Sequence, residues 1–285
     1  MRYRLIALDL DGTLLSRDQQ VSRENAEAIA RAQAAGVMVV PCTGRGWGES
    51  RLYLKDIDGL HHGVFNTGAV VVEMDSGRAV DLADFEPHLV MELVESLRHL
   101  PHAVLVYQEF SRAGCDYLIT GDGPLREETQ RWIDVNGLRV KENRNPGLED
   151  LHHTMRVGLV AQRDRAFAVE RQVLERFPGQ VSIHCFAGVP TADPAEQWFI
   201  VEIFAASVNK WRGIQWLANH HGFAAEQIAT VGDEINDLAM LESAGLGIAM
   251  GNAVPAAKKA ANRITLPQAE HGVAHAIHQM LDGHW

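Results

Sequence analysis

The feature that most constrains the fold is a short apolar run, Leu5–Leu8, that leads directly into two aspartates, Asp9 and Asp11. A continuous apolar run of this kind is typical of a strand buried on both faces, as in a parallel sheet. Because residues i and i+2 of a strand point to the same side, both carboxylates lean into one cleft at the strand's C-terminal end. Burying two carboxylates so close together is costly without a cation. The pair therefore predicts either a divalent-ion site, most simply for Mg²⁺, or an acidic turn that ends the strand.

Three further segments place polar groups at a strand end or at a helix start. Cys42–Arg45 follows the apolar run Val37–Val40 and offers a hydroxyl and glycine-adjacent backbone amides. Lys210 opens a predicted helix, and Gly232–Asp237 follows the apolar run Ile228–Val231. Each segment alone also fits an ordinary role: a loop, a solvated lysine, and a helix N-cap whose acids favour the helix dipole.

Apolar runs that alternate with helical segments predict an α/β fold with a doubly wound, mostly parallel sheet. Ser22 is placed to cap a helix that Gly36 ends. In such sheets ligands bind beyond the C-terminal strand ends, near the switch in strand order. The strands are expected at Leu5–Leu8, Val37–Val40, Gly63–Asn66, Ile228–Val231 and Leu246–Met250, which puts Asp9, Asp11, Thr43, Asn66 and Asp233 at such ends.

Between residues 85 and 202, expected strands that occur in pairs with a few helices predict an inserted α+β domain. The segment 140–150, rich in Asn, Pro and Gly, is expected to be an exposed connection. At 285 residues the chain is long enough for about two domains, and we expect a core of residues 1–84 and 203–285 around an insert of residues 85–202. Within the insert, helices are expected at Glu86–Leu100 and Arg165–Phe177, and strands at Ala103–Tyr107, Asp116–Thr120, Arg156–Ala161, Val181–Phe186 and Trp198–Phe204.

Composition narrows the classes of function. With 46% hydrophobic and 22% charged residues the chain is expected to fold around sizeable cores. A net charge of −11 argues against general attraction to nucleic acid or to an anionic membrane. Cys42, Cys115 and Cys185 are too few and too widely spaced for a disulfide framework or a zinc motif. The first apolar stretch is cut short by acids, and no run reaches the roughly 20 apolar residues of a membrane span, so a cytoplasmic protein is expected.

Taken in this order, the four polar segments resemble the motifs of the haloacid dehalogenase (HAD) superfamily of aspartate-nucleophile phosphatases. Within it the chain is most similar to the Cof-type group, whose Rossmann-like core carries a large α/β cap between the second and third motifs. Asn66–Ala69 and Ala249–Ala253, followed by Lys258, also match. The chain departs from the pattern at Thr67, where the family usually reads Asn-Gly-Ala, and at Glu234, where the residue is often small or polar.

The resemblance implies roles in the hydrolysis of a phosphate monoester. Asp9 is the expected nucleophile, Asp11 the general acid and base, and Lys210 the group that neutralises charge near the phosphoryl group. Mg²⁺ is the expected cofactor, held by Asp9, Asp233 and the backbone carbonyl of Asp11. The remaining expected site residues are Thr43, Gly44, Asn66 and Asn236 on the substrate, Asp237 orienting Lys210 or the metal's waters, and Arg45 either on the substrate or at the surface.

We therefore expect a magnesium-dependent phosphatase that acts on a small phosphorylated metabolite, such as a sugar phosphate, as a monomer or small homo-oligomer. A phosphomutase of the superfamily would need a second phosphate site, and no compact basic cluster stands out in the insert. A non-catalytic regulator that binds phosphometabolites would be expected to lack Asp9 or Asp11, and both are present. Arg112, Arg156 and His184 are candidates to reach the substrate. His271, His275 and His278 share a helical face, which favours an ordinary amphipathic helix over a metal site.

Overall fold

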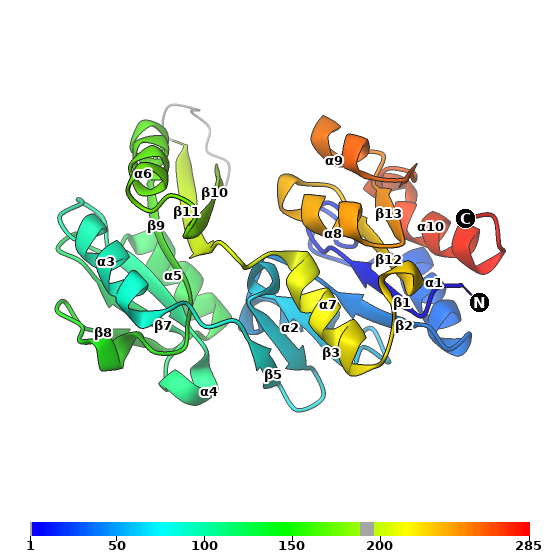
Figure 1. The fold of residues 1–285 in the computed structure, drawn as a ribbon, viewed down its shortest axis with the longest axis horizontal. Helices are drawn as coiled ribbons and strands as arrows, with labels where there is room; N and C mark the ends of the chain where they lie inside the picture. Colours follow the sequence, from blue (N-terminus) through cyan, green and yellow to red (C-terminus); the bar gives the residue numbers. More distant parts are fainter. Residues whose placement is uncertain (1, 189–196) are drawn as a thin grey trace. The chain divides into compact units, whose positions relative to one another are not determined.

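The computed structural model describes residues 2–188 and 197–285 and divides into two units (Figure 1). Unit 1 comprises Met1–Leu82 and Asn209–Trp285, and unit 2 comprises Ala83–Val208. The expected boundary after residue 202 differs from the observed one because strand β11, Trp198–Ala205, stays paired with the sheet of unit 2 to its last residue.

Unit 1 is built on a five-stranded parallel sheet, which confirms the predicted fold class. The strand order is β14-β13-β12-β1-β2. The chain order therefore reverses beside β1, and such a switch point opens a crevice at the C-terminal strand ends. The strands are β1 Leu5–Leu8, β2 Met38–Pro41, β12 Ile228–Gly232, β13 Leu246–Ala249 and β14 Arg263–Ile264.

Helices of unit 1 pack against this sheet. Leu5 and Ala7 of β1 share one hydrophobic cluster with side chains of α7 and α8. Because alternate residues of a strand face opposite ways, Ile6 and Leu8, which are also buried, face the other side. Helix α1 begins at the predicted cap Ser22 and contacts α10. The helices are α1 Arg23–Ala34, α2 Trp47–Leu54, α7 Lys210–His220, α8 Leu238–Ser243, α9 Pro255–Ala260 and α10 Gly272–Leu281.

The segment predicted as the third parallel strand forms a strand, but it belongs to another sheet. Strand β3, His62–Phe65, forms an antiparallel sheet with β4, Val70–Glu73, and β5, Arg78–Leu82. A tight turn after β3 folds the chain back, and β4 pairs with one edge of β3. One parallel bridge, Cys42 to Val64, still holds the end of β3 beside the end of β2.

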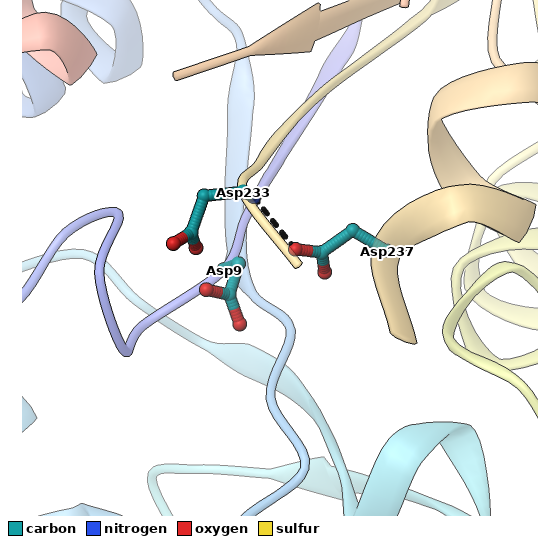
Figure 2. Close-up of side chains that lie close together, drawn as sticks. All are labelled: Asp9, Asp233 and Asp237. Carbon is teal, nitrogen blue, oxygen red and sulfur yellow. Dashed lines mark hydrogen bonds between the residues drawn. The ribbon is translucent and has the colours of Figure 1, made fainter. Parts of the chain in front are cut away.

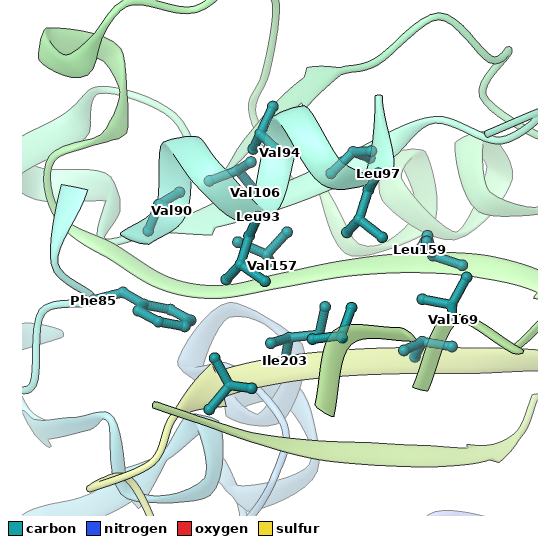
Figure 3. Packing of buried hydrophobic residues seen from close by; sticks show 14 of the residues in the cluster. Phe85, Val90, Leu93, Val94, Leu97, Val106, Val157, Leu159, Val169 and Ile203 are labelled. Atoms are coloured by element: carbon teal, nitrogen blue, oxygen red, sulfur yellow. The ribbon is translucent and has the colours of Figure 1, made fainter. Parts of the chain in front are cut away.

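Unit 2 is an α+β domain around a six-stranded sheet of order β10-β11-β9-β6-β7-β8. Helices α3, Pro87–Leu97, and α6, Arg163–Arg176, cover one face over an apolar core (Figure 3). Helix α5, Glu127–Asn136, packs on other residues of the sheet through Ile133. The remaining elements are α4 Phe110–Ala113, β6 Val104–Gln108, β7 Tyr117–Thr120, β8 Val140–Glu142, β9 Thr154–Gln162 and β10 Val181–Ala187.

The exposed connection expected at residues 140–150 carries regular structure at both ends. Val140–Glu142 forms the edge strand β8, parallel to β7, and Leu148–Leu151 forms a 3₁₀ turn. The side chains of β8 are exposed, so the strand carries no apolar alternation that would reveal it. The side chain of Asp150 holds the segment together by accepting hydrogen bonds from Lys141 and Asn143.

No helix among the described residues is both long enough and apolar enough to span a membrane.

Candidate active site

Three carboxylates meet at the C-terminal edge of the parallel sheet. Asp9 follows β1 and Asp233 follows β12, and these two strands pair side by side in parallel. Asp237 ends the 3₁₀ turn Ile235–Asp237 that comes just after β12. Carboxylate oxygens of the three residues lie within 4.8 Å of one another, and all three side chains are buried (Figure 2). The sequence predicted that Asp9 and Asp233 would meet here.

Lys210 supplies the positive charge within this cluster. It is the first residue of α7, after the cap Asn209, and its side chain is completely buried. Its Nζ donates to Asp9 Oδ1 at 2.5 Å and to Asp237 Oδ1 at 2.6 Å. Burial lowers the pKa of Lys210, but the negative charges of Asp237 and Asp9 outweigh burial and raise the pKa above its ordinary value. Lys210 is therefore a permanent cation that touches the expected nucleophile.

Both carboxylate oxygens of Asp237 are engaged by the protein. Oδ1 accepts from Lys210, and Oδ2 accepts from the backbone N–H groups of Asp233 at 2.7 Å and Glu234 at 2.9 Å. These bonds fix the loop that carries Asp233 and hold the ammonium group against Asp9. Two roles were expected for Asp237, and these contacts fit the one in which it orients Lys210.

Asp233 is oriented by two residues to which sequence reasoning gave no role. Its Oδ1 accepts from Thr13 Oγ1 at 2.9 Å, and Asn252 Nδ2 approaches Oδ2 at 3.4 Å. Asn252 Nδ2 also donates to the carbonyl of Gly12 at 2.9 Å and so ties the loop after β1 to the site. The sequence could have pointed to these two residues only by their position. Thr13 lies beside Asp9 and Asp11, and Asn252 lies within the segment Ala249–Ala253 that matches the family pattern.

The charges and pKa shifts of the three carboxylates are those of a site that can bind a cation. Burial raises the pKa of Asp9 well above its ordinary value; Lys210 opposes this shift, whereas Asp237 and Asp233 add to it. Burial likewise raises the pKa of Asp233 to about 6, against the hydrogen bond from Thr13. Three buried carboxylates lie near one ammonium group, so negative charge is in excess. The atoms of these carboxylates that could bind a metal ion are all oxygen atoms. Such a donor set can hold a hard metal ion, with Asp9 and Asp233 as its side-chain ligands.

The side chain of Asp11 lies outside the carboxylate cluster. It is half-exposed and forms a two-point ion pair with Arg45, whose Nε donates to Oδ2 at 2.7 Å and whose Nη2 donates to Oδ1. Arg45 also donates to Gln19 Oε1, and its guanidinium lies 5.0 Å from the centre of the Tyr53 ring. Neither of the two roles expected for Arg45 included an ion pair with Asp11. Spacing in the sequence does not show which loops face each other.

The loops after β2 and β3 meet and form a lining of polar groups. Thr67 N donates to the carbonyl of Thr43 at 3.0 Å, and Asn66 N donates to the carbonyl of Arg45 at 2.9 Å. A Cβ atom on Gly44 would lie 3.5 Å from Thr67 Oγ1 and 3.6 Å from Asn236 Nδ2. The structure therefore brings the expected substrate residues of these loops together, with Asn236 beside them.

Thr67 is a further candidate in this lining. Its backbone φ is positive, as is that of Asn66, and its side chain is buried. Its Oγ1 is shielded from solvent and has no hydrogen-bond partner among the described residues. A buried hydroxyl without a partner is costly, so it is a natural contact for a bound oxyanion. The sequence showed Thr67 only as a departure from the family pattern.

The remaining candidates make other contacts within their own units. His275 bonds Thr265 and His278 bonds Arg31, and their helix buries an apolar face, as expected of an ordinary amphipathic helix. Arg112, Arg156 and His184 all belong to unit 2. Arg112 approaches Glu109, Arg156 pairs with Glu202, and the His184 ring lies beside Phe204.

Comparisons with known proteins identify the family of the chain. The pattern of the haloacid dehalogenase-like hydrolase family matches residues 6–277. Two Bacillus subtilis proteins are similar over nearly their full length. The 5-amino-6-(5-phospho-D-ribitylamino)uracil phosphatase YitU is 30% identical over 95% of this chain and 94% of its own, and phosphatase YwpJ is 28% identical over 98% and 100%. A solved haloacid dehalogenase-like hydrolase from Bacteroides thetaiotaomicron superposes with a TM-score of 0.74 at 25% identity, covering 98% of this chain and 99% of that one. The chain belongs to the haloacid dehalogenase-like hydrolases.

Proposed function

We propose that this protein is a magnesium-dependent phosphatase that hydrolyses a small phosphorylated metabolite, such as a sugar phosphate, through an aspartyl-phosphate on Asp9. The observation that carries the proposal is the buried Asp9 carboxylate, 2.5 Å from the ammonium group of Lys210 and beside Asp233. Membership of the hydrolase family and the phosphatase activities named for similar proteins support it.

The chemistry follows from the two acids that come after β1. A carboxylate oxygen of Asp9 attacks phosphorus, and the P–O bond to the leaving alcohol breaks as Asp11 gives that oxygen a proton. Asp11 then takes a proton from water, whose oxygen attacks the phosphorus of the aspartyl-phosphate. Inorganic phosphate leaves, and the Asp9 carboxylate is restored.

The surrounding residues neutralise and position the phosphoryl group. Lys210 holds a fixed positive charge next to Asp9, where negative charge would otherwise repel the substrate. Mg²⁺, held by Asp9, Asp233 and the backbone carbonyl of Asp11, would neutralise further charge between the carboxylates and the phosphoryl oxygens. The phosphoryl oxygens accept hydrogen bonds from the lining formed by Thr43, Gly44, Asn66, Thr67 and Asn236.

Unit 2 acts as the cap that selects the substrate in this proposal. Every residue assigned to bond making and breaking lies in unit 1. Specificity for the leaving alcohol is then left to residues 83–208, which have a hydrophobic core of their own.

The direct test is phosphate release from a panel of phosphorylated metabolites, with and without chelator. Activity should vanish in excess chelator and return with Mg²⁺, whereas Ca²⁺ should substitute poorly because its larger, looser coordination misplaces the nucleophile. The matched control is Asp9→Asn, which is nearly the same size and should be inactive in Mg²⁺. Full activity in excess chelator would overturn the metal dependence, and full activity of Asp9→Asn would overturn the assigned nucleophile.

A further inference from the structure

Two pairs of neighbouring histidines, far apart in the sequence, meet within unit 1. His61 and His62 stand at the start of β3, and His220 and His221 stand at the end of α7, which packs on β3 (Figure 1). The centroids of the His62 and His221 rings are 5.7 Å apart, and those of His220 and His221 are 5.4 Å apart. His62, His220 and His221 therefore form one group of imidazole rings, the histidine cluster.

The histidine cluster is separate from the carboxylates of the candidate active site. Helix α7 begins at Lys210, which contacts Asp9, and ends at His220. Eleven helical residues span roughly 15 Å. Strand β3 likewise begins at His62, and the polar lining of the active site follows its other end. The cluster therefore lies at the far ends of two elements whose near ends carry the proposed chemistry.

The separation of the rings fits two imidazoles on one metal ion. In zinc sites the nitrogen lies about 2.0–2.1 Å from the ion and the ligands are tetrahedral, so the centroids of two coordinated imidazole rings stand roughly 5–6 Å apart. The His62 and His221 centroids are within this range, and their rings are nearly perpendicular. Edge-to-face packing of rings gives similar distances, so the chemistry of the nitrogens decides between the two.

The nitrogens of the cluster are suited to ligation. His62 Nδ1 is shielded from solvent and has no hydrogen-bond partner among the described residues. A polar atom in that position is costly, and no hydrogen bond at Nδ1 opposes a turn of the ring toward His221. Burial lowers the pKa of both His62 and His221, and the neighbouring rings His221 and His220 respectively add to this effect. Neutral imidazoles with a free lone pair are the form that binds metals.

The surroundings of the cluster favour a cation. His221 is the C-cap of α7, where the last carbonyl groups carry partial negative charge. Glu73 pairs with His62 across the β3–β4 ladder, so a carboxylate lies on the next strand. Arg78 approaches Glu73 at 3.6 Å and neutralises part of this charge. Both the helix end and Glu73 would therefore stabilise a positive ion beside the rings.

We propose that His62 and His221 bind a transition-metal ion of the Zn²⁺ class, with water completing its coordination. Imidazole suits Zn²⁺, Cu²⁺ and Ni²⁺, whereas Mg²⁺ prefers the oxygen atoms of the carboxylate cluster. Among the described residues only that carboxylate cluster brings three donor groups within 4.8 Å of one another, so the histidine cluster offers a two-ligand site. The ion ties the start of β3 to the end of α7 and stabilises both elements. This inference is independent of the proposed phosphatase function.

The test is a titration of the protein with Zn²⁺, followed by calorimetry, in an Asp233→Asn background that removes one ligand of the carboxylate cluster. We expect saturable binding and a rise in Tm with Zn²⁺. His62→Gln and His221→Gln should each weaken the binding at least about tenfold, since even loss of an outer-shell partner commonly costs that much. Co²⁺ used as a probe should give the visible absorption of a nitrogen-ligated ion, and this absorption should fall in both variants.

The matched control is His61→Gln, which removes the adjacent histidine, whose exposed ring pairs with Asp75 at 2.8 Å. This variant should bind Zn²⁺ like its parent. Because His221 is exposed, His221→Gln keeps the test decisive if the half-buried His62→Gln folds poorly. The inference is wrong if no saturable binding is seen, if His221→Gln binds like the parent, or if His61→Gln weakens binding as much as His221→Gln. The last result would indicate scattered chelation by surface histidines.

Discussion

At the scale of single residues, the site concentrates more negative charge than its protein donors can neutralise. Lys210 serves both Asp9 and Asp237, and Asp233 has only hydrogen bonds from Thr13 and Asn252. Asp9 and Asp233 therefore both titrate above their ordinary pKa. The stability of the metal-free protein should depend on pH for this reason.

The pH dependence has a definite sign. Unfolded Asp233 has a pKa near 3.8, and burial raises the folded pKa to about 6. Between these values the folded state keeps a proton that the unfolded state has lost, so the free energy of unfolding falls as pH rises from about 4 to 6. For Asp233 alone the fall is about 3 kcal/mol. In chelator, urea unfolding from pH 4 to 7 should show a steep fall in the wild type and a smaller fall in Asp233→Asn, in which Asp9 still has a raised pKa.

The control is Asp18→Asn, which changes an exposed aspartate in the same unit and should keep the wild-type slope. Mg²⁺ should stabilise the wild type most above pH 6, where the carboxylates are ionised. An equally steep fall in Asp233→Asn would show that Asp233 is not the group responsible.

At the scale of elements, the loop after β1 must pass very close to Asp233. Gly12 has φ +76, and a Cβ atom there would collide with a carboxylate oxygen of Asp233. Gly12→Ala should therefore weaken Mg²⁺ binding by displacing a ligand, besides the roughly 1 kcal/mol of backbone strain. The control is Gly114→Ala, with φ +78 and open space around it, which carries the strain alone. Equal losses of stability and unchanged Mg²⁺ affinity in the two variants would contradict this account.

Strand ends were the most predictable part of the site. Apolar runs locate β1, β2 and β12 to within about one residue, and parallel pairing then forces Asp9 and Asp233 together. Contacts between loops were not predictable, because they depend on which side chains face each other across the crevice. The pair of Asp11 with Arg45 and the buried hydroxyl of Thr67 belong to this class.

The sequence also did not show which sheet each predicted strand joins. The run at β3 indicates a buried strand, but a central parallel strand and the first strand of a meander look alike when both are apolar. Edge strand β8 carries exposed side chains and no apolar period. Strand β4 was not expected either, although its three valines are buried. Local pattern therefore locates most strands that the fold buries, and it misses edge strands such as β8 that are held mainly by backbone hydrogen bonds.

At the scale of the whole molecule, each unit has its own hydrophobic cluster, and the candidate metal site belongs to unit 1 alone. Mg²⁺ binding should therefore slow amide hydrogen exchange in β1 and β12 more than in β9 of unit 2. Exchange followed by mass spectrometry, with and without Mg²⁺, checks this. Asp233→Asn should lose the effect, and equal slowing in both units would contradict the separate roles.

The most direct test of the central claim separates the two acids after β1. Asp9→Asn removes the attacking oxygen, so no phosphoenzyme can form. Asp11→Asn keeps the nucleophile but loses proton transfer, which is worth on the order of 10²–10⁴-fold. With 4-nitrophenyl phosphate, whose leaving group needs no proton, this variant should accumulate phosphoenzyme because water attack lacks its base. Intact-protein mass after rapid quench should show one added phosphoryl group on Asp11→Asn and none on Asp9→Asn. A phosphoryl group on Asp9→Asn would mean that another residue is the nucleophile.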